Sequence, residues 1–335
     1  MIVHPWGSST WRDDAEQWAH HQLDKLHIRL AGPMTDLSIQ PWSAVWRIPT
    51  ADGDVLLKQS IAARATEGSV HAFCADVAPD HVDPPLALDE SSGRVLFADG
   101  GPVMSETCSD TPAGIAAMVG EYAQLQQATI GHDDRAEAAG LPGWDPAAAG
   151  REAESQAAVL HALPPSDPRH MTTAQKAQLL AGLDVFHTSG TALAQSPIPY
   201  TVEHGDLWAG NVLVPQGPSG RYRFIDFGDA AWTHPFISLM PLLFGCHHRW
   251  LPRPSPFDPN HPALQLLIET YLRHWTEYAD LPELTETLHH ALRVAPLRRS
   301  RALITNMDRA TSEDVDELGP LPWAWLQTAI SPPAS

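Results

Sequence analysis

Residues 200–230 read YTVEHGDLWAGNVLVPQGPSGRYRFIDFGDA. This stretch holds His204, Asp206 and Asn211 in the spacing H-x-D-x-x-x-x-N, and Asp226-Phe227-Gly228 begins fifteen residues after Asn211. Each half follows a short apolar run, and the turn-rich QGPSG separates them, which predicts two hairpin strands with their polar ends at one rim. Mg²⁺ binds few protein oxygens and completes its shell with water and phosphate. The two aspartates and the asparagine therefore favour a magnesium–nucleotide site.

Each motif has a plainer interpretation when it is taken alone. HGD is a common tripeptide, DFG can be a simple turn, and Asn211 or Asp229 can satisfy loop backbone. The two motifs in this order and separation, each preceded by a predicted strand, are much harder to obtain by chance.

The stretch resembles the catalytic loop and metal-binding segment of the aminoglycoside phosphotransferase and choline kinase group, which are small-molecule kinases with a protein-kinase-like fold. In that group H-G-D replaces the eukaryotic H-R-D, as it does here. The resemblance implies that Asp206 is the catalytic base beside the substrate hydroxyl. It also implies that Asn211 and Asp226 hold Mg²⁺ and that His204 braces the loop.

Residues 36–58 predict three strands, with a hairpin turn at Asp52-Gly53 and Lys58 at the end of the third strand. A strand lysine is the expected partner of nucleotide phosphates in a kinase fold. Glu67 falls in a predicted helix over 63–75, where the family carries the acid that pairs with this lysine. Alone, the two residues read as surface charges; the order lysine, glutamate, catalytic loop, DFG favours the kinase pattern.

The nucleotide side of the site is less clear from sequence. The segment 41–44 (PWSA) lacks the G-x-G-x-x-G of protein kinases, and Ser43 is a candidate phosphate neighbour in its place. Residues 84–99 predict a second hairpin. In the family the equivalent strand enters the inter-lobe hinge, which makes Phe97, Ala98, Asp99 and Gly101 candidate purine neighbours. Nothing here chooses ATP over GTP.

Beyond about residue 104 the pattern predicts helices over 111–130, 148–162, 172–194, 236–248, 262–280, 284–294, 296–311 and 320–331, with loops at 131–146 and 163–169. The expected fold class is α+β: a bilobal, protein-kinase-like fold with a small antiparallel-sheet N-lobe over residues 1–101 and a large helical C-lobe over residues 102–335. The N-lobe begins with an amphipathic helix that starts at Ser9-Thr10.

Composition limits the class of partner. The chain has 335 residues, 43% of them hydrophobic, and a net charge of −19, which argues against nucleic-acid and anionic-membrane binding. No apolar run approaches the length of a membrane span, and the first residues lack the pattern of a signal peptide. Three widely spaced cysteines fit a reduced, cytoplasmic setting. A monomer or a homodimer is expected.

Candidate acceptor residues are Trp208, Asp229, Asp308 and Glu313, since aromatic rings stack on sugars and acids attract cationic antibiotics. The plainer interpretations are core packing for the tryptophan and a solvated acidic loop at 308–317. After DFG the family carries an aspartate where this chain has Ser238, within the segment 234–239 (HPFISL). Bracing of the loop is then expected from Asp229, His234 or Ser238.

The expected function is transfer of the γ-phosphoryl group of ATP or GTP to a hydroxyl of a small molecule. The acceptor is expected to be an antibiotic of the aminoglycoside, macrolide or sugar-nucleoside type, which would make the chain a resistance or self-resistance enzyme. The first alternative is a metabolic kinase for an amino sugar, sugar, choline or homoserine. The second is a nucleotide-binding module with weak catalysis.

Overall fold

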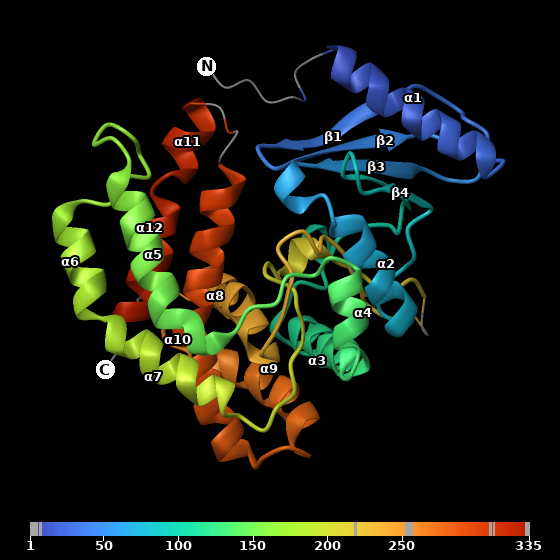
Figure 1. Ribbon diagram of the computed structural model, residues 1–335. Coiled ribbons are helices and arrows are strands. Elements are labelled where there is room, and N and C mark those ends of the chain that lie inside the picture. Colours follow the sequence, from blue (N-terminus) through green and yellow to red (C-terminus); the bar gives the residue numbers. More distant parts are fainter. Residues whose placement is uncertain are drawn as a thin grey trace.

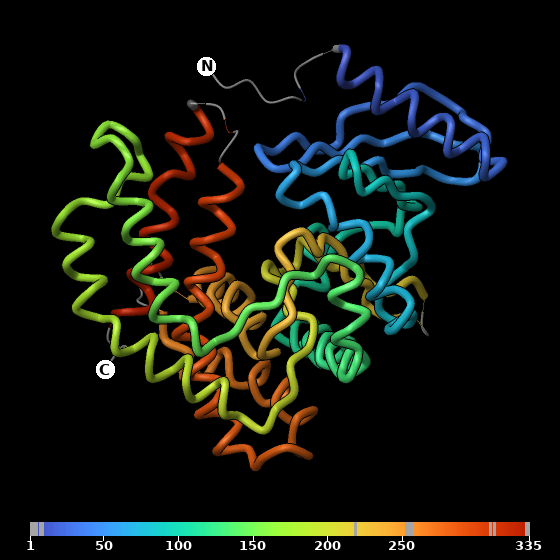
Figure 2. Tube along the Cα trace, in the orientation of Figure 1, coloured from blue at the N-terminus to red at the C-terminus, as the bar shows by residue number. Residues whose placement is uncertain are grey.

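The computed structural model describes residues 6, 9–217, 220–251, 257–307, 310 and 312–331. A sheet with one long covering helix forms the N-terminal part, and helices form most of the remainder (Figure 1). The chain trace in Figure 2 shows the sheet region, in blue, set to one side of the green-to-red helical region. The expected division into a sheet-rich and a helical part is therefore present.

Five strands form one antiparallel sheet in the order β1-β2-β3-β5-β4. Their bounds are β1 Thr35–Gln40, β2 Ser43–Ile48, β3 Val55–Ser60, β4 Ala87–Asp89 and β5 Arg94–Ala98. The prediction of three strands within 36–58 is confirmed. The third strand continues to Ser60, so Lys58 lies inside it rather than at its end.

The helix α1, Ser9–Lys25, lies across one face of this sheet (Figure 1). Side chains alternate between the faces of a strand, so one set from each strand meets α1. That set forms a separate apolar core: Ala15, Ala19 and Leu23 of α1 with Ala44, Trp46, Ile48, Val55, Leu57 and Leu96 of the sheet. Lys58 alternates with these residues and points to the opposite face.

Two short antiparallel ladders hold the 200–233 region. β6, Thr201–Glu203, pairs with β9, Ala231–Thr233, and β7, Val212–Leu213, pairs with β8, Arg223–Phe224. One connection, 204–211, runs from β6 to β7, and the other, 225–230, runs from β8 to β9. Both connections join the same two ladders, so they lie side by side. This arrangement agrees with the hairpin predicted for residues 200–230.

The helices after α1 are α2 Glu67–Val77, α3 Pro112–Thr129, α4 Asp133–Ala138, α5 Ala149–Ala162, α6 Thr173–Ala181, α7 Leu183–Ala194, α8 Leu239–Trp250, α9 Pro262–Leu272, α10 Leu281–Asn306, α11 Ser312–Leu318 and α12 Leu321–Ile330. Within the described ranges, no helix combines the length and the hydropathy needed to cross a membrane.

Four helix predictions are wrong in detail. The predicted helix 262–280 ends at Leu272 as α9 and is followed by a 3₁₀ turn, Arg273–Trp275. The predicted loop 131–146 contains the short helix α4. The predicted helix 172–194 is two helices separated at Gly182, where an added Cβ would lie 2.6 Å from the side chain of Ile330. The predicted helices 284–294 and 296–311 are the single helix α10, which continues through Pro296. A proline disfavours a helix interior, but α10 packs against α7 and α12, and this tertiary packing overrides the local preference.

Candidate active site

Lys58 lies at the centre of a cluster of ion pairs on the face of the sheet opposite α1. Its Nζ is 2.5 Å from Oε1 of Glu67, the first residue of α2, and 2.9 Å from Oδ1 of Asp226. Ser60, on the same face of β3, donates a hydrogen bond of 2.7 Å to the other carboxylate oxygen of Glu67. The structure thus brings together three of the predicted residues, from the sheet, α2 and the β8–β9 connection.

The cluster keeps Lys58 and Asp226 charged at neutral pH. Burial alone would lower the pKa of Lys58, but Asp226 and Glu67 outweigh it and raise that pKa above its ordinary value. Burial alone would raise the pKa of Asp226, but Lys58 and Arg64 hold it well below its usual range. A fixed ammonium and a fixed carboxylate side by side suit a polyphosphate and a divalent cation, respectively.

The catalytic-loop residues Asp206 and Asn211 are joined through the backbone. The amide nitrogen Nδ2 of Asn211 donates a hydrogen bond of 2.8 Å to the carbonyl oxygen of Asp206. The backbone N–H of Ile225 donates to the carbonyl oxygen of Asn211 at 3.1 Å, which ties this loop to the segment before Asp226. Because Nδ2 is occupied, the side-chain oxygen of Asn211 is the atom left for a metal ion.

His204 is fully buried between the two connections. Its ring centroid is 5.0 Å from that of Phe227, and its Nε2 is 2.9 Å from the carbonyl oxygen of Ile225. Burial lowers the pKa of His204, so the ring is neutral near pH 7. A carbonyl can only accept, so Nε2 carries the proton and Nδ1 accepts from the backbone N–H of Asp206, at 3.4 Å. The imidazole therefore links the DFG segment to the loop.

Gly205 explains why the loop reads H-G-D. Its φ of 79° lies in the left-handed region, and an added Cβ would lie 2.2 Å from the carbonyl oxygen of Asp229. Asp226 has a φ of 66°, a conformation that costs an L-residue about 1–2 kcal/mol. Such strain persists where the surrounding contacts over-determine it, and here the ion pair with Lys58 holds the carboxylate.

Arginines contact two aspartates of the site, Asp206 and Asp229. The sequence analysis did not predict these arginines. Arg299 of α10 places Nη2 3.0 Å from Oδ1 of Asp206 and donates from Nη1 to the carbonyl oxygen of Gly205 at 2.9 Å. Arg64, in the 3₁₀ turn Ala62–Arg64 between β3 and α2, forms an ion pair with Asp229. The only sequence signal was the Arg298-Arg299 pair within a predicted helix, which has no motif around it.

Arg298, the neighbour of Arg299, contacts the same region from α10. It lies 3.2 Å from Oε2 of the buried Glu203 and donates to the carbonyl oxygen of Asp229 at 2.8 Å. Glu203 in turn accepts from the backbone N–H of Gly205 at 2.7 Å. The bend at Gly205 is thus hydrogen-bonded from both sides.

Ser238, at the position where an aspartate was expected, contacts the catalytic loop directly. Its hydroxyl accepts from the backbone N–H of His204 at 3.1 Å and lies 2.7 Å from the hydroxyl of Tyr122. His234 accepts instead from the backbone N–H of Phe236, at the start of the next turn. Of the three candidates for bracing, Ser238 and Asp229 are therefore in contact with the loop network.

The predicted purine neighbours lie at the end of β5, which pairs with the strand of Lys58, and just after it. Phe97 of β5 pairs with Leu56 of β3, and Val95, two residues earlier on β5, pairs with Lys58. The ring centroid of Phe97 is 4.7 Å from that of His71. At the end of the strand, Oδ1 of Asp99 accepts from the backbone N–H of Gly101 at 2.9 Å.

Ala98, between these residues, is exposed, and Ser43 is buried at the first position of β2, opposite Ser60. Ser43 therefore lies on β2, next to the strand of Lys58, and on the same face of the sheet as Lys58.

The predicted acceptor residues are scattered. Trp208 lies in the catalytic loop and is 47% exposed, which is unusual for so large an apolar side chain. Asp229 is held by arginines, as described above. Glu313 is exposed on α11, and Asp308 lies outside the described residues.

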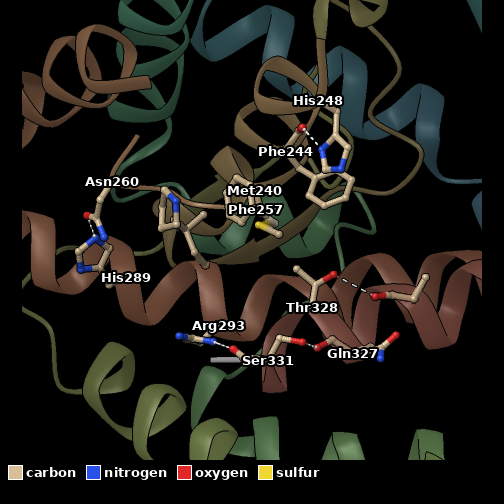
Figure 3. A pocket seen from close by; sticks show the side chains of 13 residues that line it. Met240, Phe244, His248, Phe257, Asn260, His289, Arg293, Gln327, Thr328 and Ser331 are labelled. Carbon is tan, nitrogen blue, oxygen red and sulfur yellow. Dashed lines mark hydrogen bonds between the residues drawn. The ribbon is translucent and has the colours of Figure 1, made fainter. Parts of the chain in front are cut away.

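A hollow of about 430 Å³ lies in the helical part, between α8, α10 and the end of α12 (Figure 3). Its wall includes no residue that the sequence singled out. Trp325 links it to the active site, since its ring is 4.8 Å from that of Phe244 and 6.0 Å from the guanidinium carbon of Arg299. The lining residues are Met240, Phe244, His248, Phe257, Pro259, Asn260, His289, Leu292, Arg293, Ala324, Gln327, Thr328 and Ser331.

The sheet with its buried lysine, the paired connections and the helical remainder define a kinase-like phosphotransferase. The model of the phosphotransferase enzyme family APH matches residues 40–286, and the chain belongs to that family. It is a small-molecule kinase.

Solved structures of the same fold cover nearly the whole chain. Macrolide 2'-phosphotransferase type I is 15% identical, with a TM-score of 0.60, covering 95% of this chain and 97% of its own. An ethanolamine kinase of Plasmodium vivax is 13% identical, with a TM-score of 0.64 and coverages of 97% and 90%. A thermostable mutant of aminoglycoside phosphotransferase APH(4)-Ia, in a ternary complex with ADP and hygromycin B, is 14% identical, with a TM-score of 0.54 and coverages of 93% and 99%. At these identities the likeness shows the protein-kinase-like fold. No curated protein matches the chain.

Proposed function

We propose that the chain transfers the γ-phosphoryl group of ATP or GTP to a hydroxyl of a small molecule, with the lobes meeting near Gly101. The observation that carries the proposal is the position of Lys58, whose ammonium lies between the carboxylates of Glu67 and Asp226. A buried strand lysine held by a helix glutamate, next to an aspartate after a catalytic loop, is the arrangement that phosphoryl transfer requires.

The donor nucleotide would lie between the sheet and the two connections. Lys58 would contact its phosphates, Ser43 would neighbour them, and the residues 97–101 would face the base. Asn211 and Asp226 would hold Mg²⁺, because Asn211 offers an amide oxygen while its Nδ2 binds Asp206, and Asp226 offers a carboxylate held anionic. A bound Mg²⁺ supplies charge neutralisation for the phosphates.

Asp206 would orient the acceptor hydroxyl and accept its proton. Burial raises the pKa of Asp206 to about 6, while Arg299 opposes the shift. The carboxylate is therefore mostly ionised at pH 7 and has a pKa close to the working pH, as a general base should have.

The acceptor we favour is an antibiotic, of the aminoglycoside, macrolide or sugar-nucleoside type, with the chain acting in resistance or self-resistance. The exposed Trp208, two residues after Asp206 in the catalytic loop, supports a sugar-bearing acceptor, because an aromatic face stacks on the apolar face of a sugar. A metabolic acceptor, such as an amino alcohol, is the second candidate. It is supported by the fold likeness to an ethanolamine kinase over 97% of the chain.

A coupled nucleotide-consumption screen tests this proposal. The purified protein is assayed with Mg-ATP and Mg-GTP against antibiotics, amino sugars, choline and ethanolamine, with Asp206→Ala as the blank. Acceptor-dependent consumption by the wild type alone, with a phosphorylated product by mass spectrometry, is the expected result. Mg-nucleotide binding in a thermal-shift titration without turnover on any acceptor would contradict catalysis and indicate a nucleotide-binding module.

A further inference from the structure

Arg299 makes the most direct contact with the proposed catalytic base. Its guanidinium binds the carboxylate of Asp206 and the carbonyl oxygen of Gly205 with separate nitrogens, at 3.0 and 2.9 Å. One rigid planar group thus fixes both the side chain and the preceding peptide of the base. The side chains of Arg299 and Asp206 are 15% and 32% exposed, so the pair is partly buried and salt screens it less than an exposed pair.

Asp229 connects this contact to the sheet region. One of its carboxylate oxygens pairs with Arg64, and the other lies 3.6 Å from Nη1 of Arg299. Arg64 and Asp229 are 165 residues apart, and both side chains are almost wholly buried. The guanidinium carbon of Arg64 also lies 5.7 Å from the ring of Trp42, in the turn between β1 and β2. A continuous chain of contacts therefore runs from that turn to Asp206.

We propose that Arg299 is a positioning residue for Asp206, and that Asp229 couples it to Arg64, so that the placement of the base depends on how the sheet region meets the catalytic loop. The inference rests on the proposed function of Asp206. It assigns a role to residues that lie outside both motifs and come from α10 and from the turn before α2.

A split between kcat and KM distinguishes positioning from a purely structural role. Arg299 contacts the side chain of Asp206 and the carbonyl oxygen of Gly205, which belong to the catalytic loop, whereas Lys58 and Asp226 face the proposed nucleotide. Loss of Arg299 should therefore lower kcat and leave the KM for the nucleotide unchanged, because it displaces the base and not the nucleotide site.

The test compares Arg299→Gln and Arg299→Lys with the control Arg301→Gln. Arg301 lies on the same helix, is exposed, and pairs with Glu152 at 3.5 Å. We expect Arg299→Gln to lower kcat by about 10- to 100-fold, since displacement of a catalytic group by about 1 Å costs roughly 10²-fold. The KM for the nucleotide should stay within about twofold, because the nucleotide site is unchanged. Arg301→Gln should match the wild type.

Arg299→Lys keeps the charge but loses the second contact, so its kcat should lie between those of the wild type and Arg299→Gln. It also serves as the readout if Arg299→Gln does not fold, which thermal unfolding reports. An unchanged kcat in a folded Arg299→Gln would overturn the proposal. If the wild type itself shows no acceptor-dependent turnover, the proposed function has failed instead.

The coupling to Arg64 is tested by a double-mutant cycle on kcat with Arg64→Gln and Arg299→Gln. A double variant about as slow as Arg299→Gln alone is expected, because Arg64 acts on Asp206 through Asp229 and Arg299. Strictly multiplicative effects would show that the two arginines act independently and would overturn the coupling.

Discussion

The substitution Gly205→Ala tests the geometry of the catalytic loop. The added Cβ would lie 2.2 Å from the carbonyl oxygen and 2.6 Å from the carbonyl carbon of Asp229, whereas ordinary contact begins at 3.4 Å. The two connections must therefore separate by about 1 Å, and a displacement of this size at a catalytic group costs roughly 10²-fold in rate. Neither side can yield easily, because Arg298 binds the same carbonyl oxygen at 2.8 Å and Glu203 binds the N–H of Gly205 at 2.7 Å.

Gly131→Ala is the matched control, because Gly131 has a φ of 77° and no atom within 4 Å of an added Cβ. Both variants incur the left-handed cost of about 1–2 kcal/mol, and Gly205→Ala adds about 1–3 kcal/mol of overpacking. Urea unfolding measures these costs, and nucleotide consumption with the acceptor from the screen measures kcat. Equal kcat in the two variants would refute the described loop geometry.

Three further predictions concern other parts of the site and the fold. Lys58→Met should lower kcat/KM for the nucleotide by about 10²-fold or more in steady-state assays. An unchanged value would show that Lys58 does not contact the nucleotide phosphates. Trp208→Ala should raise the KM for the acceptor by about 2- to 10-fold, which corresponds to the loss of one aromatic contact, and should leave the melting temperature unchanged. An unchanged KM would show that Trp208 does not contact the acceptor. Burial lowers the pKa of His71 to about 4 and of His234 to about 3, so both stay neutral in the fold and protonate on unfolding below about pH 6.5. Each histidine should therefore lower the free energy of unfolding by roughly 2 kcal/mol between pH 7 and pH 5. In urea titrations, His71→Gln should show a smaller decline over this pH range than the wild type, and an equal decline would contradict the lowered pKa of His71.

The sequence was informative where a residue type is dictated by local geometry. Gly205 must be glycine because of its φ and the carbonyl next to it, and the strand pairing of 212–213 with 223–224 follows from apolar runs on either side of a turn. These constraints arise within residues 200–233, so the two motifs record them. The contact of Lys58 with Glu67 was predicted instead from the family resemblance, because the order lysine, glutamate, catalytic loop, DFG matches the kinase pattern.

The rest depends on contacts between segments far apart in the chain. Arg299 reaches Asp206 only because α10 continues through Pro296, which local propensity argues against. Ser238 contacts His204 through a buried hydroxyl that no motif predicts. The hollow between α8, α10 and α12 has walls from separate segments, so it has no signature in the linear sequence.

The most direct test of the central claim is the turnover of Asp206→Asn beside its affinity for Mg-nucleotide. The substitution keeps the size of the side chain and removes its ability to take a proton. We predict a kcat about 10²–10⁴-fold below that of the wild type, with nucleotide affinity within about twofold by calorimetry. A folded Asp206→Asn that phosphorylates the acceptor at a rate close to that of the wild type would contradict it.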